Sequence, residues 1–151
     1  MSRIVLTTSS SGLDDMDIQH NVELIRLRIH VNDVEFIDGK NINSERLQYL
    51  MNEVSHSPVH TSPAPAHEVA MMLSNLQSRG IKEVFITTLS SKVSESYQII
   101  SEVAKSFADN MDIYVYDTKD LNACEALLAL EADYFMRQGY AMSDIASRLD
   151  A

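Results

Sequence analysis

The sequence is poor in residues that many binding and structural motifs require. It has a single cysteine, Cys124, which excludes a disulfide within the chain and a zinc site of the Cys-x-x-Cys type. Its four glycines form no Gly-rich loop of the kind that cradles phosphates, which weakens a nucleotide-binding role. We expect Cys124 to be buried on the apolar side of a helix, as an inert thiol.

Basic residues and long apolar runs are also scarce. Lys and Arg number 12 against 22 Asp and Glu, and the net charge of −10 argues against nucleic acid or an anionic membrane surface as a partner. No apolar stretch is long enough to cross a bilayer, and the N-terminus lacks the apolar core of a secretion signal. We therefore expect a cytoplasmic protein without membrane insertion, and its 151 residues predict one globular domain.

Residues 83–97 place an apolar run, a group of hydroxyls and a helical pattern in direct succession. Residues 84–86 (Val-Phe-Ile) are typical of a buried parallel strand, and residues 87–91 carry hydroxyls. Apolar residues at spacings of three and four then predict a helix from Val93 to Phe107. Such a junction can bind a carboxylate or a phosphate through hydroxyls and free N–H groups. Alternatively, Ser91 simply caps the helix.

The N-terminal half predicts further strands. Residues 4–6 read as a short buried strand, followed by five consecutive hydroxyl residues at 7–11. Residues 22–31 predict one strand, in which Leu27, Ile29 and Val31 face the core while Arg26, Arg28 and His30 face water. Residues 34–36 return as a hairpin strand. We expect His30 to be an exposed surface residue and not a metal ligand.

Helical patterns follow residue 43 and alternate with strands from about residue 51 onward. The long helix after residue 117 is expected to bury one side, formed by Leu121, Cys124, Leu127, Leu128, Tyr134 and Phe135. Alternation of strand and helix indicates an α/β fold with a mostly parallel sheet flanked by helices. Ligands bind such sheets beyond the carboxyl ends of the strands, where we expect the loops at residues 7–11, 61–62, 90–91 and 117 to meet.

Two catalytic or metal-dependent interpretations are weaker. A hydrolase that uses Ser62 with His60 or His67 has no Gly-x-Ser-x-Gly elbow to support it. A metal site from His56, His60 and His67 would have no carboxylate or cysteine at a matching spacing. We therefore expect a protein without catalysis of its own.

The order of five short motifs resembles the DegV family, bacterial proteins that bind a fatty acid. These motifs are Leu-Thr-Thr-Ser-Ser at 6–10, Asp-Gly-Lys-Asn-Ile at 38–42, Thr-Ser-Pro at 61–63, Ser-Ser-Lys-Val-Ser-Glu-Ser-Tyr at 90–97 and Asp-Thr-Lys at 117–119. The resemblance implies a three-layer α/β/α domain. Several family members are the acyl-carrying subunit of a fatty acid kinase, so it also implies a long-chain fatty acid and that kinase's catalytic subunit as partners.

The resemblance also implies which residues hold the ligand. The carboxylate would be bound by hydroxyls of Thr61, Ser62, Ser91 and Ser94, with Ser9 and Ser10 of the first motif nearby, and no cofactor would be needed. The acyl tail would occupy a hydrophobic tunnel, which some of the eight methionines could line.

The sequence departs from the family pattern at several places. The family usually has aspartate where Thr8 stands, glycine where Glu95 stands, and glycines around Cys124 and Ala126. Family members also typically have a second domain, so we expect residues 1–151 to form a single domain like the family's N-terminal one, with the second domain absent. These departures keep a second hypothesis open, a homodimeric protein-interaction module that has lost lipid binding.

Overall fold

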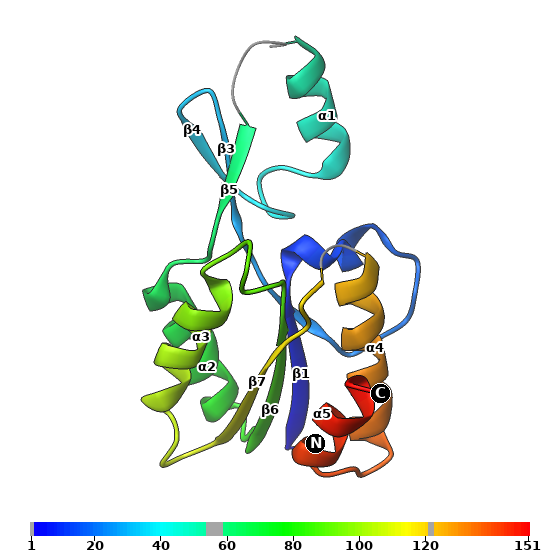
Figure 1. The fold of residues 1–151 in the computed structure, drawn as a ribbon. Coiled ribbons are helices and arrows are strands. Elements are labelled where there is room, and N and C mark those ends of the chain that lie inside the picture. The colour runs from blue at the N-terminus through cyan, green and yellow to red at the C-terminus, as the bar shows by residue number, and fades with distance from the viewer. Residues whose placement is uncertain (1, 54–58, 121–122) are drawn as a thin grey trace.

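The computed structural model describes residues 2–53, 59–120 and 123–151, which form two connected parts (Figure 1). The strands are β1 (Arg3–Thr8), β2 (Glu23–Ile25), β3 (Arg28–Val31), β4 (Val34–Ile37), β5 (Val59–Ser62), β6 (Glu83–Thr88) and β7 (Asp112–Asp117). The α-helices are α1 (Ser44–Glu53), α2 (Ala66–Ser78), α3 (Ser96–Lys105), α4 (Ala123–Arg137) and α5 (Met142–Leu149). Two short 3-10 turns, Ser9–Ser11 and Leu13–Asp15, follow β1.

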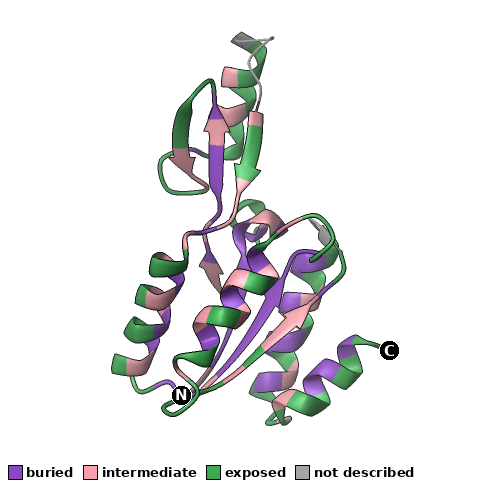
Figure 2. Ribbon diagram, turned by 60° about the vertical axis from the view of Figure 1, so that its left-hand side comes forward, coloured by how far each residue is buried: buried purple, intermediate pink, exposed green. Residues whose placement is uncertain are grey.

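The larger part is a three-layer α/β/α unit, as predicted. Its four-stranded sheet has the order β2-β1-β6-β7, and all three strand pairs are parallel. Because successive side chains of a strand face opposite sides, Ile4 and Leu6 of β1 point to one face and Val5 to the other. Helices α2 and α3 cover the first face, and α4 and α5 cover the second (Figures 1 and 2).

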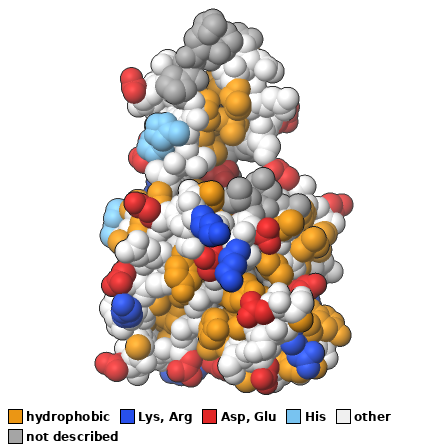
Figure 3. Space-filling model, viewed as in Figure 1, with side chains coloured by type: hydrophobic (Ala, Val, Ile, Leu, Met, Phe, Trp, Pro, Cys, Tyr) orange, Lys and Arg blue, Asp and Glu red, His pale blue; other side chains and the backbone are white. Residues whose placement is uncertain are grey.

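The smaller part is a three-stranded antiparallel sheet, order β4-β3-β5, which carries α1 on one face. The predicted hairpin is present as β3 and β4. Ile29 and Val31 form its small core together with Leu47 and Leu50 of α1. Figure 3 shows this part above the larger one, with histidine side chains gathered at one edge.

The prediction of one strand over residues 22–31 is wrong, because the chain changes sheets in the middle of this segment. Residues 23–25 are the edge strand β2 of the parallel sheet, whereas residues 28–31 are the central strand β3 of the small sheet. At the change, the Leu27 N–H donates to Ser9 Oγ (2.9 Å). Arg26 pairs with Asp14 (2.7 Å) and donates to the carbonyl of Asp38 (3.0 Å). These bonds replace ladder bonds that a continuous strand would make.

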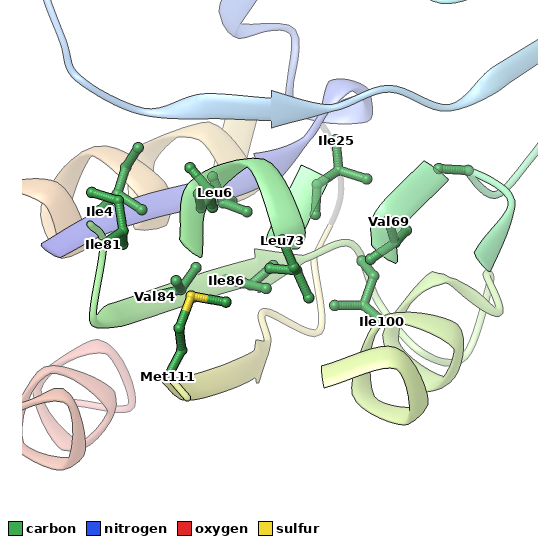
Figure 4. Close-up of a cluster of buried hydrophobic side chains, with 12 residues drawn as sticks. Ile4, Leu6, Ile25, Val69, Leu73, Ile81, Val84, Ile86, Ile100 and Met111 are labelled. Atoms are coloured by element: carbon green, nitrogen blue, oxygen red, sulfur yellow. The ribbon is translucent and has the colours of Figure 1, made fainter. Parts of the chain in front are cut away.

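The first core lies between the parallel sheet and helices α2 and α3 (Figure 4). Leu6, Val84 and Ile86 from the sheet pack there against Leu73 and Ile100, and each of these five side chains is at most 1% exposed. Full burial of an aliphatic side chain stabilises the fold by about 1.5–3 kcal/mol, so this layer fixes both helices on the sheet.

Helix α4 buries a different side from the predicted one. Most of its buried residues are small or polar, and Met136 near its C-terminal end is the large apolar exception; the set is Glu125, Ala126, Ala129, Ala132, Asp133 and Met136, all at most 4% exposed. Of the six residues predicted to be buried, Leu128 and Phe135 are half-buried against this core, whereas Leu127 and Tyr134 are 59% and 54% exposed and Cys124 is exposed. Leu121 lies outside the described residues. Alanines let α4 approach the sheet closely, and close packing is the physical reason why small residues occupy the buried face.

No helix in residues 2–53, 59–120 and 123–151 has both the length and the apolar character needed to cross a membrane.

Gly39 lies at the junction between the two parts, beside the ion pair of Arg26 and Asp14. Its φ is +79°, and a Cβ there would collide with the Arg26 guanidinium and the Asp14 carboxylate. We expect Gly39→Ala to lower the free energy of unfolding by about 2–3 kcal/mol in urea denaturation, from left-handed strain and the displaced ion pair. Gly80→Ala is the matched control, because Gly80 has φ +84° but open space around it. Equal losses in the two variants would contradict the proposed collision.

Candidate ligand-binding site

The polar loops of the larger part converge at one edge of its sheet. The 3-10 turn at Ser9–Ser11 follows β1, residues 89–95 follow β6, and Thr118 follows β7. Because these strands are parallel, their carboxyl ends meet at this edge, and the smaller part lies above it (Figure 1).

A cavity of about 370 Å³, hereafter the hydroxyl cavity, lies where the two parts meet. Its lining combines hydroxyl, apolar and charged residues: Leu27, Thr61, Ser62, Pro63, Leu89, Ser91, Lys92, Val93, Ser94 and Glu95. Four of the six predicted site residues, Thr61, Ser62, Ser91 and Ser94, are therefore brought together. They come from two segments that are about thirty positions apart in the sequence, so the fold itself creates the cluster.

Ser91 does not cap a helix, and the helix predicted from Val93 begins only at Ser96. The Ser91 hydroxyl and N–H both donate to the carboxylate of Asp117, at 2.5 and 3.3 Å. Ser94 is the residue that acts at the helix start, since its Oγ accepts the Ser96 N–H (3.1 Å) and donates to the Ser96 hydroxyl (3.0 Å). The loop between β6 and α3 is thus held at one end by Asp117 and at the other by Ser94.

Thr61 and Ser62 end β5, which belongs to the small sheet, so the expectation that their loop leaves the parallel sheet is wrong. Because consecutive residues of a strand face opposite sides of the sheet, the Thr61 and Ser62 side chains leave the backbone on opposite faces. Ser62 Oγ lies 2.8 Å from Nε2 of His30. His30 is half-buried, whereas the sequence predicted an exposed surface residue. The Thr61 side chain is exposed.

Ser9 and Ser10 are not part of the hydroxyl cavity. They line a second cavity of about 430 Å³, together with Asp14, Asp15 and Asp38. Ser9 Oγ accepts the Leu27 N–H, as described above. Burial raises the pKa of Asp38, and its hydrogen bond with Ser9 lowers it in part.

Glu125 is a buried carboxylate that the sequence analysis missed. It is 0% exposed and accepts hydrogen bonds from the hydroxyls of Thr7 (3.2 Å), Thr8 and Ser10 (2.8 Å). Thr87 in turn donates to Thr7 (2.8 Å), so the network reaches β6. Burial raises the pKa of Glu125, and the three hydroxyl hydrogen bonds oppose that rise. Its spacing of four and seven from Ala129 and Ala132 is the signal that could have placed it on the buried face.

Arg28 was predicted to face water, but it is 5% exposed. Its guanidinium forms an ion pair with Glu68 of α2. This pair links the small sheet to the larger part beside the segments that connect them, and a buried guanidinium requires such a partner.

A third cavity, of about 430 Å³, is mainly apolar and contains two of the methionines, Met71 and Met72. It shares no lining residue with the hydroxyl cavity. Chain neighbours divide between the two, since Arg26 and Ala64 line the apolar cavity while Leu27 and Pro63 line the hydroxyl cavity. The two cavities therefore lie next to each other along the connecting segments, and each has its own lining.

The described residues hold no group of three or more His, Cys, Asp or Glu side chains arranged to bind a metal ion. His56 lies outside the described residues. The charged residues that line the hydroxyl cavity are Lys92 and Glu95, one of each sign.

The protein is thus an α/β domain with a hydroxyl-lined cavity at the carboxyl edge of its parallel sheet. Residues 3–151 match the DegV family, whose description reads "Uncharacterised protein, DegV family". The chain belongs to the DegV family. No curated protein matches the sequence.

Solved structures of DegV proteins share the fold. The chain matches DegV of Bacillus subtilis, described as a fatty acid binding protein, with a TM-score of 0.86 and 20% identity over 99% of this chain and 53% of that one. A fatty-acid-binding DegV family protein from Thermus thermophilus gives a TM-score of 0.84 and 18% identity, over 99% and 52% of the two chains. A stearic acid-binding protein from Eubacterium ventriosum gives 0.82 and 19%, over 97% and 52%. The chain thus spans about half the length of these proteins.

Glu125 predicts a pH dependence of stability. Because its folded pKa is raised, the folded state binds this proton more tightly than the unfolded state, and its contribution to stability is lost as pH rises from about 4.5 through the folded value. Glu125→Gln keeps the shape and one acceptor oxygen, replaces the other oxygen by an NH2 donor, and removes the charge. We expect Glu125→Gln to be more stable than wild type at neutral pH, because it removes the charge whose burial raises the pKa of this carboxyl.

Urea denaturation at several pH values measures this difference, which should vanish below about pH 4.5. Glu131→Gln, an exposed change on the same helix, is the control and should show no such pH dependence. A Glu125→Gln variant that is less stable than wild type at every pH would show that the ionised carboxylate is required.

Proposed function

We propose that this protein binds a long-chain fatty acid in the hydroxyl cavity and has no catalysis of its own. The observation that carries the proposal is the meeting of Thr61, Ser62, Ser91 and Ser94 around one cavity. The DegV proteins of Bacillus subtilis and Thermus thermophilus, which share the fold, are described as binding fatty acids. Neutral hydroxyl donors suit a carboxylate, because hydrogen bonds to a charged acceptor are the stronger ones.

The four hydroxyls would not contribute equally. Ser91 already donates to Asp117 and Ser94 to Ser96, so a ligand would have to compete for their protons. Among the described residues, the Thr61 hydroxyl bonds no other side chain, which leaves it available as a donor. We therefore assign Thr61 the leading role.

Apolar side chains at the cavity give the acyl tail a path. Leu27, Leu89 and Val93 line it, and Val93 is 63% exposed. We propose that the tail leaves the hydroxyls along Leu89 and Val93. Lys92 offers a positive charge to the carboxylate, and Glu95 offsets it.

Removing the Thr61 hydroxyl should weaken binding most. We expect Thr61→Val to bind cis-parinarate, a fluorescent long-chain fatty acid, about tenfold more weakly, because a hydrogen bond to a charged group contributes roughly 1.5–3 kcal/mol. Ser91→Ala and Ser94→Ala should lose less affinity, because these hydroxyls already donate to Asp117 and Ser96. Ser147→Ala, on the exposed side of α5, is the control. Fluorescence titration measures all four, and unchanged affinity in Thr61→Val would contradict the assignment.

A second candidate function is a homodimeric interaction module, and the surface of α4 favours it. Leu127 and Tyr134 are large, exposed and seven residues apart, so they lie on the same side of the helix. If this surface dimerises, wild type should sediment as a dimer and the Leu127→Ser, Tyr134→Ser double variant as a monomer. A wild-type monomer in sedimentation equilibrium would exclude this candidate.

The fatty acid kinase partner, the cytoplasmic location and a single domain over residues 1–151 remain predictions.

A further inference from the structure

His30 lies next to the hydroxyl cavity without lining it, and it contacts the cavity through Ser62. Its Nε2 is 2.8 Å from Ser62 Oγ, and its side chain is 25% exposed. The contact follows from the register of the small sheet, in which His30 of β3 pairs with His60 of β5 and Arg28 pairs with Ser62. Partners in an antiparallel pair share a face, so Ser62 and His30 lie on the same side of the sheet.

The state of the imidazole decides where the Ser62 proton points. A serine hydroxyl has one proton to donate and two lone pairs to accept with. If Nε2 carries no proton, it accepts the Ser62 proton, and Ser62 then presents only lone pairs to the cavity. If Nε2 carries a proton, it donates to Ser62 Oγ, and the Ser62 proton is free to bond a carboxylate.

We propose that His30 is a positioning residue that turns the Ser62 hydroxyl into a donor for the ligand carboxylate when the imidazole is protonated. The inference rests on the proposed function of the hydroxyl cavity. A doubly protonated ring has no acceptor nitrogen, so its Nε2 must donate to Ser62. Carboxylate binding therefore tightens as pH falls through the range in which histidines titrate, about pH 5 to 8.

The charged neighbours of His30 come from three elements. On β4, the Glu35 carboxylate lies 3.9 Å from Nε2 and attracts a protonated ring. On β5, the His60 ring stacks on His30 with centroids 4.5 Å apart and planes at 6°, so two charged rings would repel each other. Arg28, two residues earlier on β3, is paired with Glu68 of α2.

Affinity for cis-parinarate at about pH 6 and about pH 8 tests the proposal, because a carboxylic acid with a pKa near 4–5 is ionised at both values. Wild type should bind about tenfold more tightly at the lower pH, the effect of one gained hydrogen bond to a charged group. His30→Gln keeps an amide donor for Ser62 but cannot titrate, so its affinity should be the same at both pH values. Ser62→Ala should also lose the pH dependence, because the hydroxyl that responds to the ring is gone.

His60→Gln is the matched control, since it removes the stacked neighbour on the same face and leaves the His30–Ser62 bond in place. It should retain a pH-dependent affinity. Binding that does not vary with pH in wild type, or a pH dependence that survives in His30→Gln, would overturn the inference and leave the proposed function standing. Absence of cis-parinarate binding in wild type at either pH would overturn both.

Discussion

The structure depends on hydrogen bonds to the hydroxyls at the carboxyl end of β1 and in the turn that follows it. Thr7, Thr8 and Ser9 are buried and Ser10 is half-buried, and an unpaired buried polar group costs about 1–3 kcal/mol. Glu125 accepts from three of them, which draws α4 against the sheet. Ser9 accepts the Leu27 N–H, which sets the point where the chain leaves the parallel sheet for the smaller one. The hydroxyls of residues 7–10 thus hold α4 against the sheet and set the position of the junction between the two parts.

The hydroxyl cavity is a consequence of that junction. Leu27 lines the hydroxyl cavity directly after the chain changes sheets. Thr61 and Ser62, at the end of β5, line the same cavity. The loop after β6 supplies the opposite wall and is anchored by Asp117. The family resemblance implies an aspartate at position 8, where this chain has Thr8. Here a carboxylate reaches Thr8 from α4 instead, and it lies outside the hydroxyl cavity.

Apolar runs and motif order predicted much of this structure. The buried strands, the three layers and the grouping of Thr61, Ser62, Ser91 and Ser94 followed from local pattern and resemblance. The change of sheet did not, because period-two alternation fits two short strands as well as one long strand. The predicted buried side of α4 was wrong, because the alanines of this helix pack against the sheet while Leu127 and Tyr134 are exposed. Glu125 was missed because its partners are more than a hundred residues away in the sequence.

Native mass spectrometry of the purified protein tests the central claim of fatty acid binding most directly. The account predicts that the native ion, after incubation with an excess of oleate, carries the added mass of one fatty acid. This mass should disappear when the same sample is denatured, because non-covalent contacts in the folded cavity hold the ligand. A native ion that keeps the bare mass of the chain under the same conditions would contradict the claim.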